Sequence, residues 1–183
     1  MNRRRCLIEI ARGVGLSMAL TMAPRWAGAE AVDRDADAAL QALYGSAPAA
    51  KRLAAEAKGI LVFPRIVKAG FLVGAQYGEG VLLKGGKPAG HYNIAAGSYG
   101  FQAGAQRFAY VMFFMKDSAL SYLENSAGFE VGAGPSVVVL DSGKARTLTT
   151  TTAREDVYAF VFGQKGLMAG MGLQGSKITK VNP

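Results

Sequence analysis

The feature that most constrains this chain is a glycine-rich stretch, Gly59 to Lys84, in which larger apolar residues and small residues alternate. From Ala69 to Tyr77 the apolar side chains fall on one parity, and most Gly and Gln residues fall on the other. Alternation predicts β-strand, because successive side chains of a strand point to opposite faces. We expect the apolar parity to face the core, and the other face to carry almost no side-chain bulk.

Four segments share this pattern of a large apolar residue followed three positions later by Gly: Phe71–Ala75, Phe101–Ala105, Phe129–Ala133 and Leu167–Met171. Their spacing is uneven, so no repeat array is predicted. Two interpretations are open. The glycines mark bends, bulges or close packing across a curved sheet, or the bare face receives a ligand such as an acyl chain or a headgroup.

Helical spacing predicts two helices before the sheet, Glu30 to Tyr44 and Ala47 to Lys58, with Ser46 capping the second. A short third helix, Ser118 to Asn125, is expected after Asp117 as its cap, with Ala119, Leu120 and Leu123 facing inward. The apolar stripe of the first helix comprises Ala36, Ala39, Leu40 and Leu43. The other predicted strands are His91–Lys116, Phe129–Leu140, Thr147–Thr152, Tyr158–Phe162 and Ile178–Val181. The fold class predicted is α+β, with two N-terminal helices packed on a strongly curved or barrel-like antiparallel Gly-rich sheet. The apolar run Phe108 to Met115 is expected to be a central strand buried on both faces.

The first 29 residues have the organisation of an export signal. Arginines at positions 3–5 precede a modestly apolar segment, and Ala27-Gly-Ala29 matches an A-x-A cleavage site. The Arg4-Arg5 pair resembles a twin-arginine signal, with the general secretory route as the alternative. We therefore expect a single mature domain over residues 30–183, periplasmic or secreted and peripherally associated with a membrane.

Charge and rare residues limit the function classes. The formal net charge is +8, of which residues 1–29 carry +4, so the remaining +4 is spread over residues 30–183. That is too sparse for a nucleic-acid surface. With one cysteine, Cys6, and one histidine, His91, no metal site, cofactor or catalytic triad is expected. The G-x-G-x-x-G string at Gly170–Gly175 is followed by a predicted strand rather than a helix, so we interpret it as a chance match.

One basic cluster lies between the second predicted helix and the glycine-rich stretch. It contains five cations and one acid, and apolar residues are interleaved with the cations. Two interpretations are open: a solvated charged face, or an edge that meets an anionic lipid surface. The candidate lipid-binding residues are Lys51, Arg52, Lys58, Phe63, Arg65, Ile66, Lys68 and Phe71.

Several separated motifs resemble the SYLF domain family over about Leu40 to Val181. They are Ala57-Lys-Gly-Ile-Leu-Val-Phe-Pro64, Val67-Lys-Ala-Gly-Phe71, Tyr77-Gly-Glu-Gly80, Gly100-Phe-Gln-Ala-Gly104 and Phe160-Val-Phe-Gly-Gln-Lys-Gly-Leu-Met-Ala-Gly170. The resemblance implies a non-enzymatic domain that binds phospholipids, including phosphoinositides, and in fungal and animal members actin. The family's membrane-binding segment corresponds by location to the basic cluster.

Three functional hypotheses follow. The first is a phospholipid-binding domain of the bacterial cell envelope, docking on anionic lipid through the basic and aromatic edge. The second is a protein-interaction scaffold with an envelope-protein or actin-like partner. The third is an enzyme of unfamiliar type, which a pocket collecting Glu79, His91 and tyrosine side chains would favour.

Overall fold

The computed structural model describes residues 26–99, 104–140, 155–166 and 175–181 of the 183-residue chain. These ranges contain helices α1 (Trp26–Ser46), α2 (Pro48–Glu56) and α3 (Asp117–Asn125). The strands are β1 (Gly59–Phe71), β2 (Val73–Lys84), β3 (Lys87–Tyr99), β4 (Gly104–Phe114), β5 (Phe129–Glu130), β6 (Val137–Leu140), β7 (Val157–Gly166) and β8 (Lys177–Val181). The predicted α+β class is confirmed.

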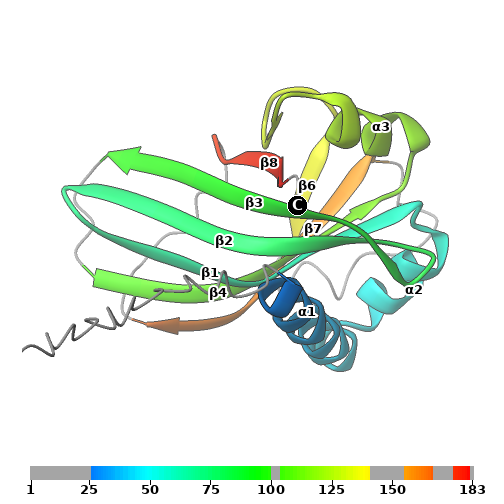
Figure 1. The fold of residues 1–183 in the computed structure, drawn as a ribbon, viewed down its shortest axis with the longest axis horizontal. Coiled ribbons are helices and arrows are strands. Elements are labelled where there is room, and N and C mark those ends of the chain that lie inside the picture. Colours follow the sequence, from blue (N-terminus) through cyan, green and yellow to red (C-terminus); the bar gives the residue numbers. More distant parts are fainter. Residues whose placement is uncertain (1–25, 100–103, 141–154, 167–174, 182–183) are drawn as a thin grey trace, which may run out of the picture.

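One curved eight-stranded sheet organises the described residues, in the order β5-β8-β3-β2-β1-β4-β7-β6. Its pairs are antiparallel, as predicted, except that β6 runs parallel to β7. In Figure 1 the long strands β1 to β4 run side by side and reach past the helices at the left-hand end of the sheet. We call the described part of this end the distal end. It comprises residues 67–77, 95–99, 104–107 and 165–166.

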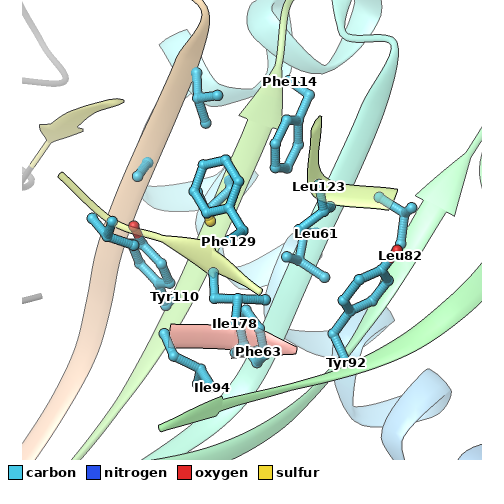
Figure 2. Close-up of a cluster of buried hydrophobic side chains, with 14 of the residues drawn as sticks. Leu61, Phe63, Leu82, Tyr92, Ile94, Tyr110, Phe114, Leu123, Phe129 and Ile178 are labelled. Atoms are coloured by element: carbon cyan, nitrogen blue, oxygen red, sulfur yellow. The ribbon is translucent and has the colours of Figure 1, made fainter. Parts of the chain in front are cut away.

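The sheet has a core on each face. On the inner face α3 and β5 cover a cluster that includes Leu61, Tyr92 and Tyr110, shown in Figure 2. On the outer face α1 and α2 pack on a second cluster that includes Val62 and Phe113. Residues 108–114 of β4 are all buried, with Phe108, Tyr110, Met112 and Phe114 in the inner cluster and Val111 and Phe113 in the outer one. The predicted central strand buried on both faces is confirmed over these residues, and Met115 lies just beyond its end and is partly buried.

A bulge in β1 decides which side chains face inward. The strand runs continuously through Pro64, and its register shifts between Phe63 and Ile66 relative to β4. Proline in a central strand is confined to bulges, because it has no N–H for the ladder. Phe63 and Ile66 both point into the inner core, although regular alternation would place them on opposite faces.

The structure overturns one prediction about the glycine-rich stretch. The apolar side chains that were expected to face the core lie on the outer face, and at the distal end Phe71, Val73 and Tyr77 are exposed. The opposite parity lies on the inner face, where Lys68 and Gln76 are buried. The extra residue in β1 moves every later side chain of that strand to the other face.

Two inner-face glycines mark close packing, the first of the two interpretations. A Cβ at Gly78 would lie 2.7 Å from Cγ1 of Ile66, and one at Gly80 would lie 2.5 Å from Cδ1 of Phe63. Both partners belong to β1 beside the bulge. At these positions the protein's own atoms fill the space above the backbone, so no room is left for a ligand.

Other local predictions needed correction. The predicted strand over Phe129–Leu140 is two short strands at opposite ends of the sheet order. Ser46 ends α1, its Oγ donating toward Ala42 O and Leu43 O at 3.1 Å each, and does not cap α2. Lys116, not Asp117, is the N-cap of α3. The predicted strand Thr147–Thr152 lies outside the described residues, as does most of the G-x-G-x-x-G string.

α1 and α3 agree with their predicted apolar stripes. Ala36, Leu40 and Leu43 of α1 are buried, as are Ala119, Leu120 and Leu123 of α3. The predicted cleavage point after Ala29 falls within the first turns of α1. Within the described ranges, no helix combines the length and the apolar character needed to cross a bilayer.

Candidate functional site

The predicted basic and aromatic edge does not form one surface. Lys51 and Arg52 are exposed on α2, Lys58 is exposed just before β1, and Phe71 ends β1. An extended strand rises about 3.3 Å per residue, so the two ends of β1 lie up to roughly 40 Å apart. Residues that are neighbours in the sequence are therefore separated by the length of the strand.

Two members of that predicted set are interior. Phe63 and Ile66 have no exposed surface and belong to the inner core, so neither is available at the surface of the folded protein. Arg65 lies on the outer face, where its Nη2 is 3.6 Å from Oδ2 of Asp35 in α1. Both of these side chains are more than half exposed, so the pair is a weak tether between α1 and the sheet.

Lys68 belongs to a buried polar row on the inner face. It is paired across the sheet with Gln76 of β2 and Gln106 of β4, and all three are at most 7% exposed. Nε2 of Gln76 donates to Oγ of the buried Ser176 at 2.7 Å. Oε1 of Gln106 has no hydrogen-bond partner among the described residues. This row closes the apolar core toward the distal end.

On the outer face, the same region carries a row of exposed side chains from four strands. The register pairs Val67 with Tyr77 on one side and with Arg107 on the other, and Arg107 pairs with Lys165 of β7. All four are exposed. We call Lys165, Arg107, Val67 and Tyr77 the outer row. It places two cations, an aliphatic residue and an amphipathic tyrosine at one level along the strands.

Beyond the outer row the surface is apolar. Phe71, Leu72 and Val73, at the turn between β1 and β2, are 69%, 50% and 62% exposed. Between this turn and the outer row, the described outer-face positions are the exposed small residues Ala69, Ala75, Gly97 and Ala105. We call Phe71–Val73 the apolar tip.

The charges of the distal end are mainly positive. Its described residues include the buried Lys68 and the exposed Arg107 and Lys165 but no Asp or Glu, and the nearest acid along β2 is Glu79, which is hydrogen-bonded to the Tyr77 hydroxyl. The acids of α1 that are paired lie nearer the other end, Asp35 with Arg65 and Asp33 with His91. The sheet therefore has one end at which positive charge and exposed apolar side chains coincide.

The groups named for an enzymatic site do not gather in one place, and His91 and Glu79 each have another partner. Nε2 of His91 lies 3.0 Å from Oδ1 of Asp33, and the hydroxyl of Tyr77 donates to Oε1 of Glu79 at 3.1 Å. Burial, and to a lesser extent the charge of Glu124, raise the pKa of Tyr92 to about 12, so this phenol stays protonated near neutral pH. No group of three potential metal ligands occurs in the described part of the chain.

Sequence reasoning missed the outer row and the apolar tip. Arg107, Lys165 and Tyr77 are far apart in the sequence, and only strand pairing aligns them. One signal was available for the exposure of Phe71: Pro64 in the middle of a strand indicates a bulge, and a bulge reverses the parity that follows.

Comparison with known proteins found a similarity to one family. Residues 95–182 match the model of the family described as Ysc84, Las17-binding protein actin regulator. That range runs from the distal part of β3 through β8. The family's description names a binding and regulatory role. A comparison with curated proteins found no match. Over residues 95–182 the chain is therefore similar to the Ysc84 family, in agreement with the resemblance of its sequence motifs to the SYLF domain family.

Proposed function

We propose that this protein is a non-enzymatic binding domain of the bacterial cell envelope that docks on anionic phospholipid through its distal end. The observation that carries the proposal is that two exposed cations, Arg107 and Lys165, lie side by side in the outer row below an exposed apolar tip. The predicted export signal of residues 1–29 supports a location in the envelope.

The electrostatic part of docking comes from the outer row. Each Lys or Arg close to an anionic bilayer contributes about 1 kcal/mol. Arg107 and Lys165 are adjacent across β4 and β7 and both are exposed. Together they contribute about 2 kcal/mol, which corresponds to roughly a thirtyfold change in affinity. Salt screens such interactions, so the affinity falls as ionic strength rises.

The proposed surface differs from the basic and aromatic edge that the sequence suggested. Lys51 and Lys58 lie at the opposite end of β1 from Phe71, so they do not meet the bilayer when the distal end does. An end-on orientation also keeps α1, with its acidic residues, away from the anionic surface.

Co-sedimentation of the full chain with vesicles tests this function. The vesicles are phosphatidylcholine alone, or phosphatidylcholine with phosphatidylglycerol, at low and at high ionic strength. We expect binding to the anionic vesicles only, weakened by salt, and roughly thirtyfold weaker for Arg107→Gln with Lys165→Gln. The matched control is Lys51→Gln with Lys58→Gln, which removes the same charge from the other end and should bind as the native protein does.

Equal binding to neutral vesicles, or equal losses for the two double variants, would refute docking through the distal end. The competing candidate is a protein-interaction domain, because the family's description names protein partners. That candidate predicts specific capture of an envelope protein in detergent, by protein that shows no affinity for either type of vesicle.

A further inference from the structure

The connection between β1 and β2 is a single residue. Phe71 pairs directly with Val73, so Leu72 alone makes the turn, with a φ of 64°. It is the one non-glycine residue with positive φ among the described residues. Leucine is disfavoured in this region because its Cβ crowds the backbone, whereas Gly or Asn adopts it readily.

Leu72 gains no compensating burial for this strain. Half of its surface is exposed, and it lies between Phe71 and Val73, which are more exposed still. A strained apolar residue at an exposed turn does not favour folding in water. Strained positions that persist are often functional. The strain at Leu72 therefore indicates a role in binding and not in folding.

The register shows how far the apolar tip extends beyond the charged groups. Phe71 lies four residues beyond Val67, which shares the outer row with Arg107. Four residues of strand span about 13 Å. Amphipathic elements at a bilayer surface bury their apolar side by about 5–10 Å. With the cations at the level of the phosphates, the tip therefore reaches the acyl chains.

Two further features fit this depth. Tyr77 lies in the outer row, and tyrosine favours the interface because its ring is apolar and its hydroxyl is polar. The backbone below the tip is paired across the hairpin from Gly70 and Gly74 inward, and a one-residue turn exposes few polar backbone groups. Unpaired backbone groups are what the hydrocarbon region excludes.

We propose that the apolar tip is a wedge that enters the acyl-chain region of an anionic bilayer, with Leu72 at its apex. This proposal rests on the proposed docking function. It adds the depth to which the domain inserts and the apolar contacts that it makes with the bilayer. Charged residues of the outer row hold the domain at the phosphates, and Phe71, Leu72 and Val73 bind the hydrocarbon.

The variant Leu72→Gly separates this role from a structural one. Glycine adopts the observed φ without strain, so the urea midpoint of unfolding should be equal or higher. Binding to vesicles containing phosphatidylglycerol should become roughly tenfold to a hundredfold weaker, because a buried leucine side chain is lost. A lower urea midpoint with unchanged vesicle binding would overturn the wedge and make Leu72 a structural residue.

Fluorescence measures the depth directly. Trp26 is the single tryptophan of the chain, so Phe71→Trp combined with Trp26→Phe reports from the tip alone. Its emission should shift to the blue on vesicles and be quenched by lipids brominated on their acyl chains. The matched control is Val139→Trp with Trp26→Phe, because Val139 is an exposed apolar residue of β6 away from the distal end.

The outcomes separate the two proposals. If the Phe71→Trp reporter sediments with vesicles but is not quenched, the wedge is overturned while docking stands. Equal quenching of both reporters also overturns it, because the tip would then have no special depth. Failure of the native chain to sediment with any vesicle overturns docking and the wedge together.

Discussion

Gly80 of β2 lies directly against the ring of Phe63 in β1. A Cβ built on Gly80 would be 2.5 Å from Cδ1 of that ring, and it would also collide with the carbonyl oxygen of Val62. The phenyl ring is fully buried in the inner core and stacks near Tyr110, with ring centroids 6.4 Å apart. The bulge in β1 thus depends on the absence of a side chain in the neighbouring strand.

We expect Gly80→Ala to destabilise the protein by about 1–3 kcal/mol, because the new methyl group overpacks the core against backbone and ring atoms. Gly97→Ala is the control, since no atom lies within 4 Å of a Cβ at Gly97. It should change stability by less than about 0.5 kcal/mol. Urea unfolding measures both, and equal effects would show that the contact at Gly80 is not restrictive.

Removing the hydroxyl of either of two buried tyrosines should change the stability of the protein in opposite directions. The Tyr110 hydroxyl is buried and has no hydrogen-bond partner among the described residues. Tyr110→Phe should therefore stabilise the protein by about 1 kcal/mol, since a desolvated polar group is removed. The Tyr158 hydroxyl accepts a hydrogen bond from the Glu155 N–H at 3.1 Å, so Tyr158→Phe should cost about 1 kcal/mol. Thermal unfolding compares them, and a loss of stability in Tyr110→Phe would contradict this account.

The junction between β6 and β7 should make stability pH-dependent. Hydrogen bonding from the Lys116 ammonium, followed by that from the Ser136 N–H, holds the pKa of Asp156 below its ordinary value. An acid whose pKa is lowered by folding stabilises the protein above its unfolded pKa of about 3.9, and this contribution disappears as pH falls through the folded pKa.

We therefore expect Asp156→Asn to be less stable than the native protein at pH 7. The difference should shrink at acidic pH, once the native carboxyl is protonated. Urea unfolding at neutral and acidic pH measures it. The control is Asp35→Asn. The partner of Asp35 is Arg65, whose side chain is more than half exposed and lies 3.6 Å away, so this ion pair is weak. A difference for Asp156→Asn that stays constant with pH would contradict the role of its charge.

α1 should contribute to stability without taking part in docking. Leu43 is 1% exposed in the outer core, so Leu43→Ala should cost about 2–5 kcal/mol. Vesicle binding of the protein that remains folded should be unchanged, because α1 packs away from the distal end. Ala38→Ser, on the exposed side of α1, serves as control. Weakened binding by folded Leu43→Ala would imply that α1 contacts the bilayer.

Much of the fold followed from local patterns. The stripe of Ala119, Leu120 and Leu123 predicted α3, and the unbroken apolar run from Phe108 predicted the central strand, because these signals lie within one element. The candidate site did not follow in the same way. Lys51 and Phe71 were grouped because they are close in the sequence, whereas an extended strand separates its ends.

The sequence by itself determined which residues of the glycine-rich stretch share a face, because alternation along a strand is a property of the backbone. Phe71, Val73 and Tyr77 lie together, and Gly70, Gly74 and Gly78 lie opposite them, as the period of two requires. Only the tertiary structure decided which face is exposed. That choice depends on the bulge beside Pro64, on where α1 ends its cover of the sheet, and on the pairing that brings Arg107 and Lys165 beside Val67. Each is a contact between distant segments, and a local pattern carries no information about such contacts.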